Sequence, residues 1–137
     1  MIFHTIQFRV LYPDTDKMGT MHHSNYAKYY ELARWELFRS IGIPYQQIEE
    51  AGVMCPVINM HFHFLKTVQY DELLTVRTRL KSIKGVRMWF TYQLYNKDNE
   101  LVNEAETELA FVEMHSWKPV APPDFVLKAI KQHHDNH

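Results

Sequence analysis

A chain of 137 residues, of which 46% are hydrophobic and 14% aromatic, has the size and composition of one domain with a substantial apolar core. The formal net charge of −1 excludes a global field that would attract nucleic acid or an anionic membrane, and the one cysteine, Cys55, excludes an intramolecular disulfide. No apolar run reaches membrane-spanning length and no secretory leader is evident. We therefore expect a soluble cytoplasmic domain without a membrane span.

The first expected element is a strand over residues 3–12, where apolar and polar residues alternate. The residues that share its apolar face are Ile6, Phe8, Val10 and Tyr12. After a polar segment, helical spacing begins near Asn25 and continues to Gly42, which predicts one long helix with Ser24 or Asn25 as its N-cap. A second, shorter helical piece is expected over residues 44–51.

The rest of the chain predicts four strands joined mostly by hairpins, over residues 57–65, 73–83, 87–95 and 101–114. A short terminal helix is expected from Asp124 to about His133, with a frayed tail over residues 130–137. This order predicts an α+β domain over residues 1–137, in which an antiparallel sheet wraps around one long central helix. Apolar residues on the outer sheet face, such as Trp89 and Tyr95, suggest burial against another subunit.

The segment between the first strand and the helix, YPDTDKMGTMHHSNY, carries a recognisable pattern. It resembles the signature of hotdog-fold thioesterases of the YbgC-like and 4-hydroxybenzoyl-CoA thioesterase group, and the resemblance extends in element order over nearly the whole chain. The positions that match are Tyr12, Asp14, Thr15, Asp16, Gly19, His23, Asn25 and Tyr26.

The resemblance implies hydrolysis of an acyl-CoA thioester to free acid and CoA, with no cofactor, because CoA is part of the substrate. It matches Asp16 to the family's catalytic carboxylate and His23 to a histidine often found seven residues later. It further implies a homodimer with active sites at the subunit interface, commonly assembled into a tetramer. An acyl carrier protein is an alternative carrier of the acyl group.

An ionised aspartate can attack the thioester carbonyl or deprotonate water, and the sequence leaves both routes open. Backbone N–H groups at the N-terminus of the long helix suit the oxyanion. We expect the motif residues Tyr12, Gly19, Asn25 and Tyr26 to contact substrate. The basic residues expected to meet the CoA phosphates are Lys66, Lys84 and Arg87.

Other interpretations stay open at this point. Asp14 and Asp16 could both be turn residues, and of the two Asp14 is assigned the structural role. His61 and His63 share a strand face and could bind a metal, but no further ligand is evident nearby, so a polar sheet surface is favoured and no metal is expected. The alternative function is a non-hydrolytic acyl-CoA or acyl-carrier binding protein, or a dehydratase-like relative, on the same fold.

Overall fold

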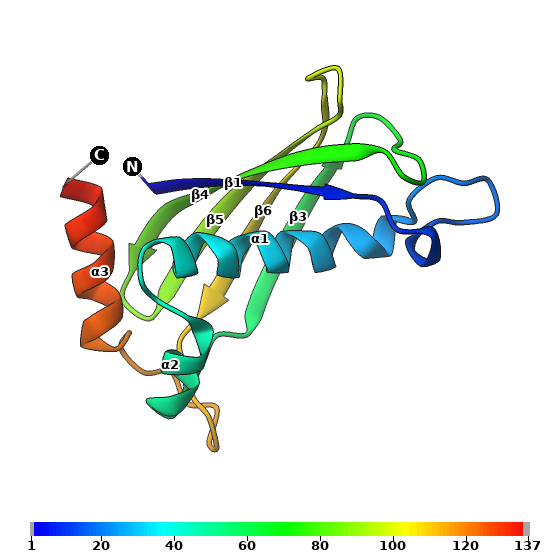
Figure 1. Ribbon diagram of the computed structural model, residues 1–137. Coiled ribbons are helices and arrows are strands. Elements are labelled where there is room, and N and C mark those ends of the chain that lie inside the picture. Colours follow the sequence, from blue (N-terminus) through cyan, green and yellow to red (C-terminus); the bar gives the residue numbers. More distant parts are fainter. Residues whose placement is uncertain (1, 136–137) are drawn as a thin grey trace.

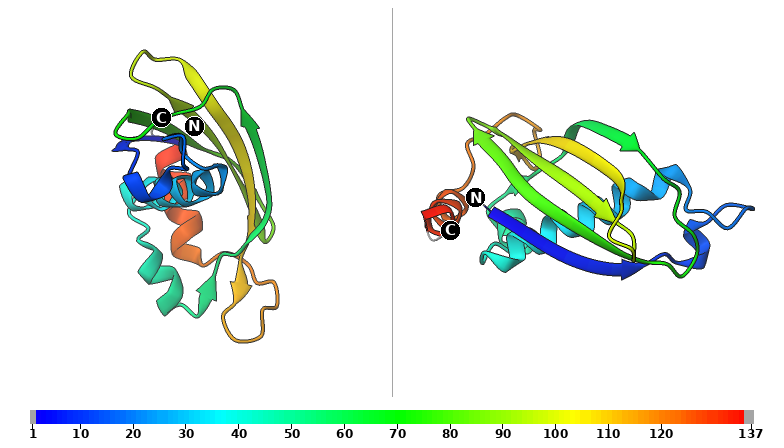
Figure 2. Two further views of the ribbon diagram at one scale, coloured as in Figure 1. Left: turned by 90° about the vertical axis from the view of Figure 1, so that its right-hand side faces the viewer. Right: turned by 90° about the horizontal axis from the view of Figure 1, so that it is seen from above.

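The fold consists of a five-stranded antiparallel sheet with one long helix against one of its faces (Figure 1). The computed structural model describes residues 2–135. In sheet order the strands are β1 (Ile2–Arg9), β4 (Leu73–Lys84), β5 (Arg87–Tyr95), β6 (Leu101–Ala110) and β3 (Val57–Phe64). The sheet curves around the helix (Figure 2), as the sequence predicted for an α+β hotdog fold.

Helix α1 (Tyr26–Ser40) turns its apolar stripe toward the sheet. Tyr30 and Leu37 on this stripe are buried, and Gly42, with φ of +85°, lies just past the helix end, as its sequence position predicted. Asn25 occupies the N-cap position, one of the two positions predicted. Its side chain makes no capping hydrogen bond, because its amide group donates to the carbonyl of Asp14 at 2.9 Å.

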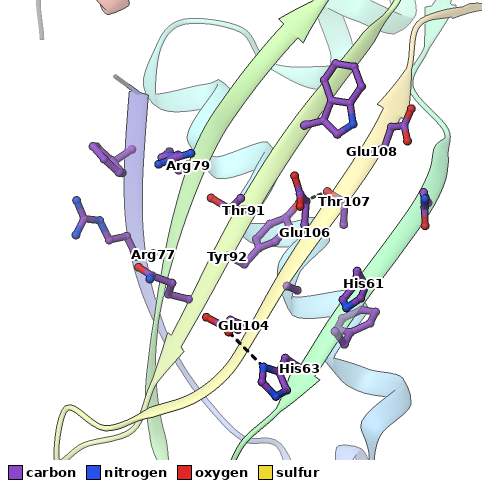
Figure 3. A pocket seen from close by; sticks show the side chains of 16 residues that line it. His61, His63, Arg77, Arg79, Thr91, Tyr92, Glu104, Glu106, Thr107 and Glu108 are labelled. Atoms are coloured by element: carbon purple, nitrogen blue, oxygen red, sulfur yellow. Dashed lines mark hydrogen bonds and ion pairs between the residues drawn. The ribbon is translucent and has the colours of Figure 1, made fainter.

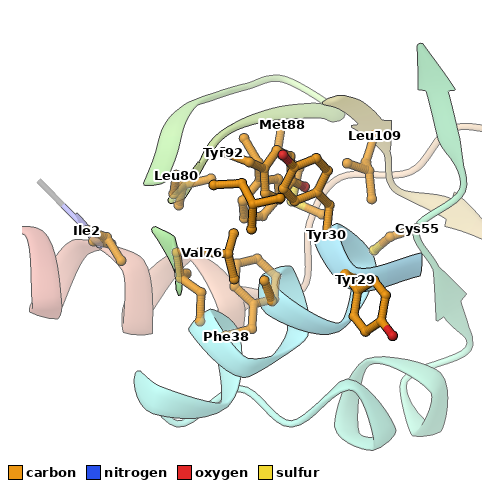
Figure 4. Packing of buried hydrophobic residues seen from close by; sticks show 14 of the residues in the cluster. Ile2, Tyr29, Tyr30, Phe38, Cys55, Val76, Leu80, Met88, Tyr92 and Leu109 are labelled. Carbon is orange, nitrogen blue, oxygen red and sulfur yellow. The ribbon is translucent and has the colours of Figure 1, made fainter. Parts of the chain in front are cut away.

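Aromatic contacts join α1 to the inner face of the sheet (Figure 4). The rings of Tyr30 and Tyr92 stack with centroids 4.6 Å apart, and those of Phe38 and Phe90 meet at 5.6 Å. All four side chains are at most 1% exposed. Complete burial of an aromatic side chain contributes roughly 1.5–3 kcal/mol, so this layer fixes the position of α1 over the sheet.

Two strand predictions differ from the structure. Strand β1 ends at Arg9, and Tyr12 is 72% exposed in a short 3₁₀ helix, because Pro13 turns the chain away from the sheet. The expected strand over residues 101–114 is interrupted after Ala110. Phe111 donates to the carbonyl of Val86, and the chain then forms β7 (Val112–Glu113), which pairs with β2 (Val53–Met54) in a separate two-stranded sheet.

The remaining helices lie at one end of the molecule (Figure 1). Helix α2 (Tyr45–Glu50) occupies the segment predicted for it. Helix α3 (Asp124–Asp135) continues beyond the predicted His133. Within the tail predicted to fray, Ile130 is 8% exposed and belongs to the same buried apolar cluster as Val126. Residues 136–137 lie outside the described part of the chain.

Strand β3 forms an edge of the sheet, paired on one side only, with β6. Both of its faces are largely open, and its exposed apolar side chains include Val57, Ile58, Met60 and Phe64. An edge of this length and hydrophobicity is a template for pairing with another chain. Among residues 2–135, no helix is long and apolar enough to cross a membrane.

Candidate active site

The polar segment between β1 and α1 is a loop whose base is closed by Asp14. This side chain is buried, and its carboxylate accepts hydrogen bonds from Lys28 Nζ at 2.6 Å and from the Tyr29 hydroxyl. The backbone carbonyl of Asp14 accepts from the backbone N–H of His22 at 2.9 Å, so the two ends of the loop are hydrogen-bonded to each other. This arrangement agrees with the structural role assigned to Asp14.

The charge of Asp14 is stabilised by these contacts. Burial alone would raise the pKa of Asp14, but the hydrogen bonds from Lys28 and Tyr29 and the positive charge of Lys28 outweigh it. The pKa of Asp14 therefore lies below its usual value. Burial and the bond to Asp14 raise the pKa of Tyr29 to about 12, so Tyr29 remains a donor across the physiological range.

Asp16 lies in the exposed tip of the same loop, where its carboxylate organises a tight turn. Oδ1 accepts from the backbone N–H groups of Met18 at 2.8 Å and Thr20 at 3.2 Å, and Oδ2 accepts from the Thr20 hydroxyl at 2.9 Å. Gly19 completes the turn with φ of +79°, a conformation that other residues rarely adopt. The Thr20 hydroxyl, followed by the Met18 N–H, lowers the pKa of Asp16, which is thus an anion with a fixed orientation.

The two histidines of the motif lie side by side and exposed, with ring centroids 4.2 Å apart. Nδ1 of His22 accepts the backbone N–H of Ser24 at 3.2 Å, so His22 caps the short 3₁₀ helix (His23–Asn25) that leads into α1. Sequence reasoning assigned His23 to the site, and the structure places His22 beside it as the cap of the 3₁₀ helix.

The motif residues expected to contact substrate differ in their exposure. Tyr12 is exposed, with its ring edge-on to that of Tyr70 at 5.6 Å. Tyr26 is 3% exposed and packs edge-on against Phe64 at 5.1 Å, so in the single chain it is a core residue. Asn25 is half-buried and is engaged with Asp14 as described above.

The three basic residues expected to meet phosphates are not brought together within one chain. Lys66 precedes residues 68–70, which run alongside residues 19–21 of the Asp16 loop, and its ammonium group pairs with Glu100. Lys84 and Arg87 flank the β4–β5 hairpin at the opposite end of the sheet. Arg87 there pairs with Glu108 at 2.6 Å.

One hollow, of about 1020 Å³, lies on the outer face of the sheet. Figure 3 shows its charged lining, which comprises Arg77 and Arg79 of β4, Glu104, Glu106 and Glu108 of β6, and His61 and His63 of β3. His63 pairs with Glu104 at 3.3 Å, so this pair of strands carries a polar surface of the kind favoured over a metal site.

A second hollow, of about 390 Å³, opens between α1 and the segment from β2 into β3. Arg34, Trp35, Cys55 and Pro56 are among its lining residues. Sequence reasoning missed Arg34, which is 2% exposed, because an arginine within a helix ordinarily indicates a solvated face. Asp16 lines neither of these hollows and is exposed, so residues 2–135 of a single chain do not enclose the predicted carboxylate.

Comparison with known proteins identifies the family of this chain. The sequence matches the family described as the thioesterase-like superfamily over residues 10–130. The chain belongs to this superfamily. This membership supports a thioester hydrolase, the enzyme class that the sequence predicted.

Individual relatives agree. The chain is 32% identical to the acyl-CoA thioester hydrolase YbgC of Escherichia coli, over 90% of this chain and 92% of that protein. It is 31% identical to the acyl-CoA thioesterase YbgC of Haemophilus influenzae, over 92% and 91% of the two chains. In structure it is similar to a DHNA-CoA thioesterase from Staphylococcus aureus, with a TM-score of 0.91 and 28% identity over 98% of this chain and 93% of the other.

Proposed function

We propose that the protein hydrolyses acyl-CoA thioesters as a homodimer, with Asp16 as the catalytic carboxylate. The observation that carries the proposal is the oriented anion of Asp16 in a loop that leads directly into the N-terminus of α1, in a member of a thioesterase superfamily. Asp16 either attacks the thioester carbonyl, expelling CoA thiolate and leaving a mixed anhydride for water to hydrolyse, or deprotonates the attacking water. CoA belongs to the substrate, and no other cofactor is required.

The β3 edge supports a shared active site. If two β3 strands pair antiparallel across a two-fold axis, the Val57 end of one strand lies beside the Phe64 end of the other. Phe64 contacts Tyr26 in the first turn of α1, so residues 52–57 of one subunit approach the helix N-terminus of its neighbour. Backbone N–H groups of both subunits could then donate to the oxyanion, and Asp16 would no longer face bulk water.

The outer sheet face supports assembly of dimers into a tetramer. Arginines line β4 and glutamates line β6 of this face, on either side of β5. Two such faces related by a two-fold axis parallel to the strands would place the arginines of one above the glutamates of the other. The Arg79→Glu variant should then give dimers instead of tetramers in light scattering.

The decisive experiment is thiol release from acyl-CoAs of short, long and aromatic type, and from acyl carrier protein thioesters, by the parent and by Asp16→Asn. We expect release by the parent and a loss of about 10²–10⁴-fold in kcat/KM for the variant. Asp98→Asn, in the β5–β6 hairpin, is the matched control, because it makes the same change in another exposed turn.

A non-hydrolytic acyl-CoA binding protein is the second candidate. The observation that favours it is the set of hydrogen bonds within the turn, which gives Asp16 a structural role in the single chain. This candidate requires acyl-CoA binding by both proteins without thiol release by either. Equal release by the parent and Asp16→Asn would instead locate hydrolysis at another residue.

A further inference from the structure

The Arg34 side chain is a buried cation that lacks a counter-charge. It is 2% exposed, and no carboxylate lies within 4.0 Å of its guanidinium among residues 2–135. Its Nη1 donates to the Tyr92 hydroxyl at 3.1 Å, and that hydroxyl also contacts Thr107 at 2.8 Å. Nε is buried and has no hydrogen-bond acceptor in the described chain. A buried charge with an unmet donor is costly to the fold, so its retention requires an explanation.

Arg34 also lines the 390 Å³ cavity beside α1. The volume lies within the range of small-molecule sites, roughly 300–1,000 Å³. The rest of the lining is mainly apolar and aromatic, with Trp35, Tyr45 and Pro56 around the arginine. An apolar wall with one cation suits a short hydrocarbon chain that ends in an anion.

We infer that Arg34 selects acyl groups that end in a carboxylate, such as a glutaryl group, by receiving that carboxylate in the cavity between α1 and β2–β3. The inference rests on the proposed function, because it concerns the acyl portion of the same thioester. In the two-fold arrangement proposed above, residues 52–57 of one subunit approach the N-terminus of α1 in its neighbour, into which the loop that carries Asp16 leads. The cavity of one protomer would then open toward the Asp16 loop of the other.

One negatively charged residue also lines the cavity. Glu31 lines it one helical turn before Arg34, but it is exposed, so solvent screens its charge far more than that of the buried arginine. The two residues consequently predict opposite mutational effects. Loss of the Arg34 charge should weaken selection of carboxylate-ended chains, and Glu31→Gln should leave it unchanged or strengthen it.

The test compares glutaryl-CoA with its neutral methyl ester and with pentanoyl-CoA. In the parent we expect kcat/KM to favour glutaryl-CoA, and in Arg34→Met we expect this preference to fall by about 10- to 100-fold, mainly through KM. Arg34→Lys, which keeps the charge, should retain part of the preference. No preference in the parent, or an unchanged preference in Arg34→Met, would overturn the inference while leaving hydrolysis of neutral substrates, and thus the proposed function, intact.

Two other outcomes would also overturn it. An equal loss of kcat for all three substrates would place Arg34 at the thioester carbonyl instead of the chain end. Dissociation of Arg34→Met into monomers in light scattering would show that the guanidinium pairs across the subunit interface.

A binding measurement keeps the inference testable if the variant misfolds or if no substrate is hydrolysed. Trp35 and Trp117 both border the cavity, so occupancy should change the tryptophan fluorescence of the wild-type protein. Thioether analogues of glutaryl-CoA and pentanoyl-CoA, which cannot be hydrolysed, are the probes. Tighter binding of the glutaryl analogue, by about 10-fold or more, supports the inference, and equal binding contradicts it.

Discussion

The Thr20 hydroxyl donates to Oδ2 of Asp16 at 2.9 Å, and the backbone N–H of the same threonine donates to Oδ1 at 3.2 Å. One residue thus holds both oxygens of the proposed catalytic carboxylate. The hydroxyl is also the largest cause of the lowered pKa of Asp16.

Thr20→Val should therefore shift the pH dependence of hydrolysis. Because the hydroxyl stabilises the anion, its removal raises the pKa of Asp16 toward its ordinary value, and the acidic limb of kcat/KM should move to higher pH. Thr20→Ser, which restores the hydroxyl, should return the limb to its original position. An unchanged limb in Thr20→Val would mean that another group controls it.

Asp14→Asn should destabilise the fold by about 1–3 kcal/mol at pH 7, because Lys28 and Tyr29 lose a charged acceptor. The folded pKa of Asp14 lies below the ordinary value of 3.8, so its stabilising effect is complete above that pH and is lost as the pH falls through the folded value. Urea unfolding of parent and variant should consequently converge in acid. A constant difference between them at all pH values would contradict the ionic role.

Cys55 should be inert toward alkylating reagents. Burial raises the pKa of its thiol to about 12, and the side chain is 6% exposed. The thiolate is therefore scarce at pH 8. Iodoacetamide should leave the native protein unmodified and modify it in urea, as measured by mass spectrometry. Rapid labelling with loss of hydrolysis would point to a cysteine nucleophile.

Ile58→Glu should disrupt the proposed dimer. Ile58 is 48% exposed on the edge strand β3, where a charge would be buried by pairing with a second strand. Light scattering should report monomers, and hydrolysis should fall with them. Leu127→Glu is the control, because Leu127 is similarly exposed, at 41%, but lies on α3. If both variants assemble like the parent, β3 is not the interface.

Gly19→Ala should cost about 1–2 kcal/mol, because alanine is disfavoured at φ of +79°. No atom lies within 4 Å of the added methyl group, so the cost comes from the backbone alone. Gly19→Asn, which tolerates this conformation better, should cost less in thermal unfolding and retain more activity. A larger loss for Asn than for Ala would indicate that space above Gly19 is needed for substrate.

The sequence predicted a helix or strand well wherever its apolar residues recur at one constant spacing along the whole element. The stripe of α1 and the alternation in β4 and β5 are of this kind, and the family pattern located the loop around Asp16. The sequence predicted strand ends poorly where a local change in the backbone ends the strand. Examples are the turn at Pro13 and the change of hydrogen-bond partner at Phe111. Arg34 was missed for another reason. The periodicity of a helix does not reveal that a charged residue faces inward, which depends on the tertiary contact with Tyr92.

Because Asp14 closes the base of the loop, the sequence of the loop tip is free to change. The carbonyl and carboxylate of this one residue anchor both ends of the loop to α1, and Thr15 and Met21 bridge just above it. Lys17 and Met18 at the tip can therefore be exchanged without disturbing the core. Libraries randomised at these two positions, or whole tips transplanted from other relatives, should yield folded proteins with altered acyl preference far more often than changes made below the anchor.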